Sequence, residues 1–130
     1  MTAVYAYPYS QDYQPAMPVV EVGLGRGGQP EPSRLSLALV DSGADGTLVP
    51  VNVLEEISAR LVGTARVRGV LGDSQLADVY LVSLRVGPHS LGAVRVVAGV
   101  EGDEIILGRN VLNQLVVTLN GLASTVEIAA

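Results

Sequence analysis

The chain has 130 residues, of which 48% are hydrophobic, and its eight basic and 13 acidic residues give a formal net charge of -5 at pH 7. This length and apolar content predict one folded domain with its own core, and the negative charge argues against nucleic acid or an anionic membrane as the main partner. The sequence contains no cysteine, which excludes disulfides, thiol nucleophiles and cysteine-based metal sites.

No apolar run approaches the length that a bilayer-spanning helix needs, and the first residues lack a basic segment followed by an apolar one. We therefore expect a soluble, cytoplasmic protein without a membrane partner. All eight basic residues are Arg, which is typical of proteins from GC-rich bacterial genomes and suggests a bacterial source.

The first 17 residues hold four of the five tyrosines and show little hydrophobic periodicity. They predict an extended N-terminal arm, either frayed or laid against the body of a domain that runs over residues 18–130. The first strand of that domain is expected over Pro18 to Leu24, where β-branched residues gather. The glycines that follow fit the dinucleotide-binding spacing, but prolines come next where a helix would be required, so residues 25–33 predict a hairpin loop.

The apolar run Leu35 to Val40 predicts a buried strand that ends at the carboxylate of Asp41. Ser42 and Gly43 follow directly, which predicts a tight turn. Removing a carboxylate from water costs on the order of several kcal/mol, and chains tolerate such a cost mostly at working sites. This stretch is therefore the first candidate for a functional site.

The same stretch partly fits the pattern of a calcium-binding loop. Asp41, Asp45 and Gly46 fit the first, fifth and sixth positions of an EF-hand loop. Gly43 and Asn52 then occupy the third and twelfth positions, where side-chain ligands are required, so the calcium interpretation fails.

The remainder of the chain predicts one short helix and a series of strands. The helix is expected over residues 51–61, and the strands over residues 65–70, 76–86, 91–98, 105–107, 116–119 and 123–128. The glycines in 69–74 predict a hairpin tip, and Asn120-Gly121 predicts a second hairpin. Gly108 would let two backbones approach closely, and His89 is expected as a solvated turn residue.

Two segments together resemble the retropepsin-like aspartic proteases. Asp41 to Asp45 resembles the Asp-Ser/Thr-Gly-Ala-Asp signature of that family, and Ile105 to Leu115 resembles its apolar-apolar-Gly-Arg-Asn/Asp segment. Both occur in the family's order and at about its usual separation, and the resemblance covers roughly residues 18–128. It implies a mainly β, single-domain protein with a closed β-barrel of the acid-protease fold and one or two short helices.

The resemblance also implies a function. It predicts an aspartic endopeptidase that hydrolyses peptide bonds without a metal or cofactor, through a water activated by two Asp41 carboxylates. Because the motif occurs once in the chain, the second Asp41 would come from another copy, so a homodimer acting on a peptide or protein substrate is expected.

Further roles are carried over from the family to matching residues. Ser42 would hydrogen-bond across the two-fold axis, Gly43 would permit the turn, and Ala44 would line a subsite. Asp45 and Arg109 would form an ion pair behind the site, and Gly108 would let the segment pack beneath the catalytic loop. A flap that covers the substrate is implied at Gly69, Val70, Leu71 and Gly72.

The chain departs from the viral pattern in two places. Gly46 stands where an acid is frequent, and a strand is added after Asn120-Gly121, which resembles bacterial and other cellular members of the family. The dimer interface is therefore expected mainly on the C-terminal hairpin.

Two other functions remain as alternatives. A non-catalytic dimerisation or peptide-binding module could keep the motif for its architecture, although Asn would then serve in place of Asp41 without the charge. A hydrolase that holds a metal on Asp41 and Asp45 lacks a nearby histidine and has too few convergent acids.

Overall fold

The computed structural model describes residues 3–68, 72–100 and 104–130. Ten strands and two short helices make up this part of the chain. In order they are β1 (Val4–Pro8), β2 (Val19–Arg26), β3 (Arg34–Val40), β4 (Thr47–Pro50), α1 (Val51–Glu56), β5 (Arg60–Arg68), β6 (Ser74–Val86), β7 (His89–Gly99), β8 (Ile105–Leu107), α2 (Arg109–Leu112), β9 (Val117–Asn120) and β10 (Thr125–Ala129).

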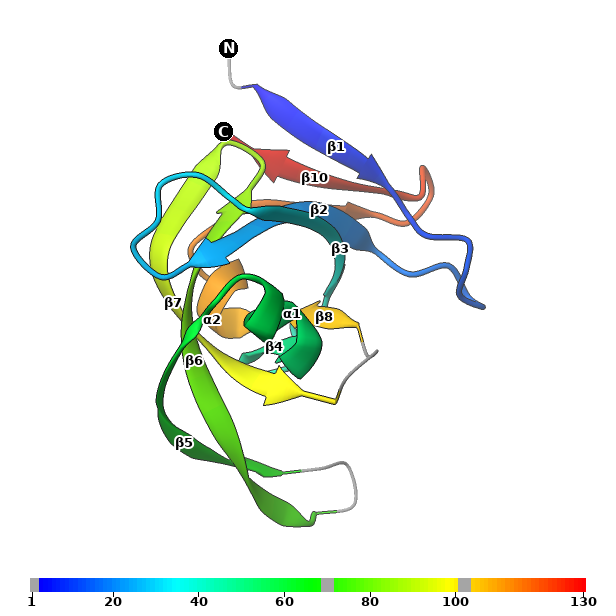
Figure 1. The fold of residues 1–130 in the computed structure, drawn as a ribbon. Coiled ribbons are helices and arrows are strands. Elements are labelled where there is room, and N and C mark those ends of the chain that lie inside the picture. The colour runs from blue at the N-terminus through cyan, green and yellow to red at the C-terminus, as the bar shows by residue number, and fades with distance from the viewer. Residues whose placement is uncertain (1–2, 69–71, 101–103) are drawn as a thin grey trace.

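The larger sheet closes on itself. Its strands pair in the order β2-β3-β8-β4-β7-β6, and β6 pairs back to β2, which forms a closed barrel with β5 added beside β6 (Figure 1). The β3–β8 and β4–β7 pairs are parallel, whereas the other pairs are antiparallel. This confirms the predicted mainly β, closed-barrel fold with two short helices.

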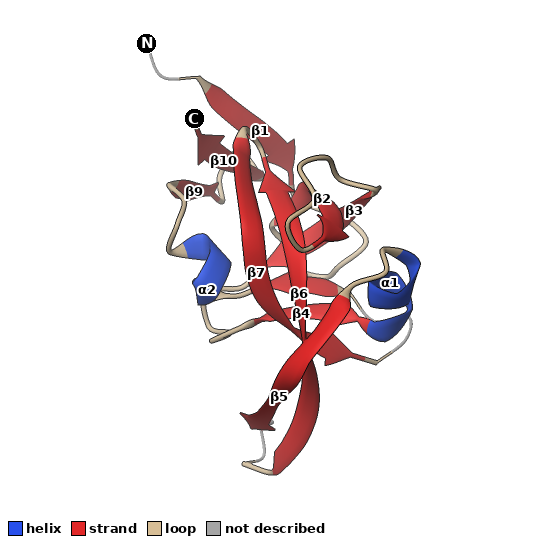
Figure 2. Cartoon of the chain, turned by 60° about the vertical axis from the view of Figure 1, so that its left-hand side comes forward, coloured by secondary structure: helices blue, strands red, loops and turns tan. Residues whose placement is uncertain are grey.

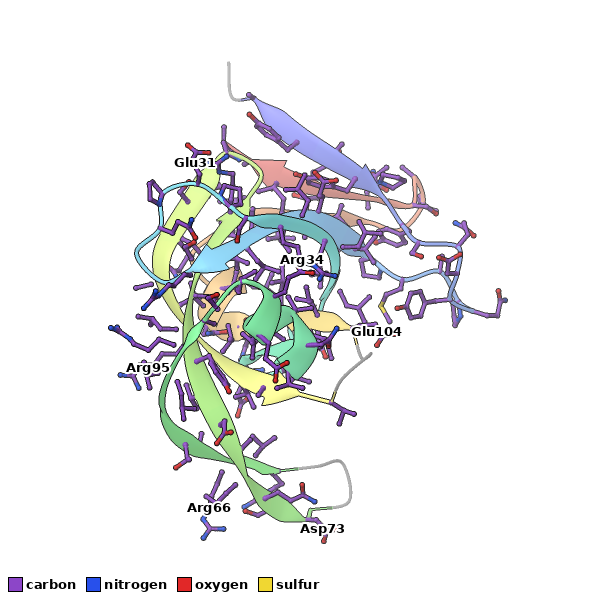
Figure 3. The ribbon with its side chains drawn as sticks, viewed as in Figure 1. Glu31, Arg34, Arg66, Asp73, Arg95 and Glu104 are labelled. Atoms are coloured by element: carbon purple, nitrogen blue, oxygen red, sulfur yellow. The ribbon has the colours of Figure 1, made fainter. Side chains whose placement is uncertain are left out.

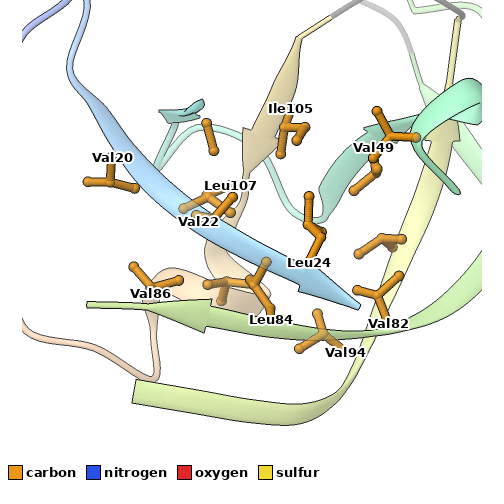
Figure 4. Close-up of a cluster of buried hydrophobic side chains, with 14 of the residues drawn as sticks. Val20, Val22, Leu24, Val49, Val82, Leu84, Val86, Val94, Ile105 and Leu107 are labelled. Atoms are coloured by element: carbon orange, nitrogen blue, oxygen red, sulfur yellow. The ribbon is translucent and has the colours of Figure 1, made fainter. Parts of the chain in front are cut away.

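The barrel interior is filled by branched aliphatic side chains. Val20, Val22 and Leu24 of β2 point inward and meet Leu84 of β6 and Leu107 of β8 (Figure 4). All five side chains are almost completely buried. Their burial provides the main driving force for folding, because apolar area removed from water contributes roughly 25 cal/mol per Å².

The prediction that residues 35–40 form a buried strand was only partly right. The strand is present, but Leu35 and Leu37 remain 64% and 62% exposed, while Ala38 is fully buried. Ala38 pairs with Val20, so the large residues of β2 already fill the interior and only small β3 side chains fit beside them. The leucines of β3 therefore face outward.

The predicted helix over residues 51–61 is also too long. Helix α1 ends at Glu56, and Ser58 takes a left-handed conformation with φ of 55°. The backbone N–H groups of Ser58 and Ala59 then donate to the carbonyls of Glu55 and Leu54, respectively. These two bonds form the Schellman termination of a helix, which lets β5 begin at Arg60.

A second, three-stranded sheet forms from the two ends of the chain in the order β1-β10-β9. Figure 1 shows the N- and C-terminal ends close together beside the barrel. The predicted hairpin around Asn120-Gly121 is present, with residues 121–124 as its loop. Strand β1 belongs to the segment predicted as an extended arm, and it pairs with β10 along all five of its residues.

His89 is the first residue of β7 and is not a solvated turn residue as expected. Its imidazole is partly buried, and Nε2 donates a hydrogen bond of 2.7 Å to the carbonyl of Ala129 in β10. The prediction failed because the partner strand lies 40 residues away in the sequence. The side chain therefore links the barrel to the terminal sheet.

The outer part of the β5–β6 pair extends away from the barrel. β7 pairs with β6 only over residues 79–86, so residues 64–68 and 74–78 form a two-stranded ribbon (Figure 2). Residues 69–71 of the tip predicted over residues 69–74 lie outside the described residues. Among the described helices, neither has the length and apolarity that crossing a bilayer requires.

Candidate active site

Asp41 stands just beyond the end of β3, where the chain leaves the barrel. Its backbone N–H donates to the carbonyl of Leu107 at 3.1 Å, which extends the pairing of β3 with β8 by one residue. The carboxylate itself is exposed in the single chain. The barrel therefore fixes the backbone of Asp41 and presents its side chain to solvent.

The turn after Asp41 is closed by two hydrogen bonds. The Gly43 backbone N–H donates to Asp41 Oδ1 at 2.9 Å, and the Ala44 backbone N–H donates to the Asp41 carbonyl at 3.2 Å. A Cβ at position 43 would lie 3.1 Å from Asp41 Oδ1, which is tighter than most real contacts. Glycine therefore allows the backbone amide to orient the carboxylate.

The start of α2 packs directly beneath this turn. The Arg109 backbone N–H donates to the Ala44 carbonyl at 2.9 Å. A Cβ on Gly108 would lie 3.0 Å from that carbonyl oxygen and still closer to the carbonyl group of Gly46. Gly108 is thus required by the close approach of two backbones and not by an unusual dihedral angle, since its φ is -93°.

The Arg109 side chain holds the loop from the other side. Its guanidinium forms an ion pair with Asp45, and Nη1 also donates to the Ser42 carbonyl at 2.8 Å. Because the Asp45 side chain is 94% exposed, this pair contributes at most about 1 kcal/mol to stability. Its main effect is to fix the position of the loop relative to α2.

Thr47 and Asn110, which were not among the predicted site residues, complete the support of the loop. The buried Thr47 hydroxyl accepts the Gly108 backbone N–H at 3.1 Å and donates to Asn110 Oδ1 at 2.8 Å. Asn110 Nδ2 in turn donates to the carbonyl of Arg95 in β7 at 3.0 Å. Asn110 stands inside the second motif and Thr47 lies two residues after the first, so a buried polar role could have been suspected there.

The structure brings together most of the predicted site residues. Asp41, Ser42, Gly43, Ala44 and Asp45 form the loop, and Gly108 and Arg109 lie against it. Of the predicted flap, Gly69, Val70 and Leu71 lie outside the described residues. Gly72 is described and has a φ of 87°, a conformation that favours glycine.

A cleft of about 540 Å³ lies beside the loop. Residues 43–46 line one side of it and residues 65–68 of β5 line another. The cleft therefore separates the Asp41 loop from the β5–β6 hairpin. Among the described residues, no cluster of three or more His, Asp or Glu side chains is arranged to hold a metal ion.

The arrangement presents one exposed carboxylate, oriented by a backbone amide, on a loop whose residues 43–46 line a cleft. Such a carboxylate can hold a water molecule by a hydrogen bond and can accept a proton from it.

Comparison with solved structures shows the same fold in known proteases. A retropepsin-like aspartic protease from Rickettsia conorii matches with a TM-score of 0.65 at 15% identity, over 100% of this chain and 96% of that chain. EIAV protease complexed with the inhibitor HBY-793 matches with a TM-score of 0.62 at 17% identity, over 83% of this chain and 93% of that chain. An aspartic proteinase from Irpex lacteus has a TM-score of 0.57 at 12% identity, over 98% of this chain and 47% of that chain.

Sequence comparison gives the family. Among curated proteins, none matches this chain significantly. The family model for the gag-polyprotein putative aspartyl protease matches residues 36–114, which include both the Asp41 loop and the start of α2. The chain therefore belongs to this aspartyl protease family and has the retropepsin-like fold.

Proposed function

We propose that the protein is an aspartic endopeptidase that acts as a homodimer, with one Asp41 from each copy at its active site. The observation that carries the proposal is the exposed Asp41 carboxylate on a loop held by the Gly43 amide, Arg109 and the start of α2. A structural turn could be held in the same way without a charge, so the carboxylate itself points to chemistry.

The proposed mechanism uses two carboxylates that share one proton. Like charges a few ångström apart disfavour double ionisation, so one Asp41 stays protonated while the other is ionised. The ionised carboxylate takes a proton from the attacking water, and the protonated one donates to the carbonyl oxygen of the peptide bond. The resulting tetrahedral intermediate collapses when the amine leaves with a proton, and no covalent enzyme intermediate forms.

The match to the Irpex lacteus proteinase supports the need for two copies. That protein matches 98% of this chain, yet the match spans only 47% of its own length. One copy of this chain therefore corresponds in length to about half of a complete aspartic proteinase. A two-fold axis beside Asp41 would supply the other half.

The terminal sheet offers an edge for this dimer. Within the described residues, β9 pairs with β10 alone, so its other edge is open, whereas β1 covers the far side of β10. Val116, Leu119 and Leu122 beside this edge are exposed. An open strand edge flanked by apolar side chains is a template for pairing, so we place the interface on the C-terminal hairpin.

The β5–β6 hairpin is proposed as the flap. Its outer ribbon borders the cleft beside the Asp41 loop and is paired to no other described strand. A two-stranded ribbon is marginally stable by itself, so it can bend without disturbing the barrel. Bending would let it close over a bound peptide and exclude water during catalysis.

The test of catalysis is the Asp41→Asn variant. Peptide hydrolysis should fall by about 10³-fold or more, because the amide can neither take a proton from water nor share one. The fold should persist, since Asn can still accept the Gly43 N–H. Asp12→Asn, an exposed carboxylate on the N-terminal segment, is the matched control and should keep full activity.

The pH dependence adds an independent test. Activity should be highest on the acid side of neutral, because the shared proton is lost when both carboxylates ionise. EDTA should leave turnover unchanged.

Near wild-type turnover by Asp41→Asn would refute the assignment of an aspartic protease. Specific binding of peptides without cleavage would favour the non-catalytic peptide-binding module.

Assembly can be tested with Leu119→Lys at the open edge. Sedimentation should show a weaker dimer, and specific activity should then depend more steeply on protein concentration. Leu35→Lys replaces a leucine on β3 that is even more exposed than Leu119 and lies outside the proposed interface, and it serves as the control. A monomer with full activity would contradict the dimeric site.

A further inference from the structure

Strand β5 brings two arginines to the cleft beside the Asp41 loop. Arg66 and Arg68 both line this cleft, opposite residues 43–46. They are two residues apart on one strand, so their side chains leave the same face of it. Both are exposed, and Figure 3 shows Arg66 standing clear of the ribbon on the outer part of the hairpin.

Neither guanidinium is neutralised within the described part of the chain. Arg66 donates a long hydrogen bond of 3.4 Å to the uncharged hydroxyl of Ser74, and neither arginine has an ion-pair partner among the described residues. Asp78 on β6 lies on the same face of the hairpin, in register with Thr64, and it forms no ion pair with any described residue. As far as the described residues go, both arginines therefore keep their charge and most of their hydrogen-bond donors for a ligand.

The acid on the opposite side of the cleft does not cancel this charge. Asp45 lines the cleft, but its carboxylate is already paired with Arg109. The cleft thus has an excess of positive charge in a chain whose formal net charge is -5. This local excess does not follow from the composition of the protein as a whole.

The cleft also has room for a side chain next to the loop. A Cβ built on Gly46 would meet no atom within 4 Å, and Gly46 is not among the residues with positive φ. A substrate side chain can therefore lie beside Gly46 without a steric clash. A carboxylate there would face the donors of β5 across the cleft.

We propose that Arg66 and Arg68 make this cleft selective for peptides with Asp or Glu close to the bond that is cleaved. The inference rests on the proposed function, because it assigns the specificity of the same site. Guanidinium groups form charge-assisted hydrogen bonds with carboxylates, which are stronger than those between neutral groups. In the dimer, the two-fold axis would place such a pair of arginines on each side of the cleaved bond.

The test compares peptides that differ only in Glu or Gln at each position around the cleaved bond. We expect kcat/KM to be about tenfold higher for the best Glu peptide than for its Gln partner. This is the effect expected of charge-assisted hydrogen bonds from Arg66 and Arg68 to the substrate carboxylate. The ratio should shrink towards one as the pH falls below about 4.3, where the substrate Glu takes up a proton while Arg stays charged.

Enzyme variants assign the preference to these residues. Arg66→Gln with Arg68→Gln should abolish the Glu/Gln ratio, and Gly46→Asp should lower it by placing a carboxylate in the cleft. Arg60→Gln is the matched control, because Arg60 is an exposed arginine on the same strand that does not line the cleft. It should leave the ratio unchanged.

Binding to the Asp41→Asn variant keeps the inference separate from catalysis. The dissociation constants of the same fluorescent peptides should show the same preference for Glu, even if no peptide is cleaved by the wild-type protein. Absence of cleavage would thus count against the proposed function alone. Equal affinities for the Glu and Gln peptides, or a ratio that survives in the double Arg variant, would overturn the inference about specificity.

Discussion

The Asp41 loop and the β5–β6 hairpin border the same cleft but are held in different ways. The loop is fixed by a hydrogen bond that Asp41 donates to β8, by one that Ala44 accepts from the start of α2, and by the Arg109 side chain. The outer hairpin is held by its own ladder and by no other described strand. One wall of the cleft is thus rigidly supported by the barrel, and the other is a ribbon that can bend.

This difference matches the two tasks proposed for the cleft. Acid–base chemistry requires a carboxylate held within a fraction of an ångström, which packing and buried hydrogen bonds provide. Binding of a peptide requires a wall that opens and closes, which a two-stranded ribbon with few buried contacts provides. Substitutions in the loop support should therefore reduce stability and activity together, whereas substitutions in the hairpin should separate them.

Gly108→Ala should have the largest effect. The added Cβ would collide with the backbone carbonyls of Gly46 and Ala44, which have no flexible end that can move away. We expect a loss of about 3 kcal/mol of unfolding free energy together with most of the activity, measured by urea denaturation and peptide hydrolysis. Gly92→Ala, where a Cβ meets nothing within 4 Å, should be nearly neutral. A stable and active Gly108→Ala protein would show that the loop support is not rigid.

Thr47→Val should have an intermediate effect. Valine keeps the shape of threonine but leaves the Gly108 N–H and Asn110 Oδ1 without their bonds to the hydroxyl. Leaving such groups unsatisfied costs about 1–3 kcal/mol, and a loss of this size should appear in thermal or urea unfolding. Thr64→Val on the exposed hairpin is the control and should change stability little. Equal effects of the two variants would remove the contrast between the regions.

Gly72→Val should cost no more stability than Thr47→Val, and its clear effect should be on turnover. Gly72 has a φ of 87°, so valine there costs about 1–3 kcal/mol of backbone strain. Gly28 is a matched control, because its φ is 85° and it too has no atom within 4 Å of an added Cβ. Gly28→Val should lose the same stability without losing turnover. If both variants lose turnover equally, the hairpin has no special role in closing the cleft.

Much of the fold followed from local sequence patterns. The strands β2, β6, β7 and β8 coincide closely with predicted apolar segments, because alternation and β-branched residues report directly on a pleated, half-buried surface. The pairing of Asp45 with Arg109 was also expected, although only from the resemblance to a family. The catalytic role of Asp41 remains a prediction.

What the sequence determined by itself was most of the strands, the turn at Asp41 and the two motifs that mark the family, whereas β1 and β4 were not predicted as strands. Only the tertiary structure decided which side chains face inward and which polar groups meet. In β3, Ala38 faces the core and the leucines face outward, because the side chains of β2 already fill the interior. Thr47 forms a hydrogen bond with Asn110, which lies 63 residues away in the sequence. Such outcomes depend on volumes and partners brought together by folding, which no local pattern contains.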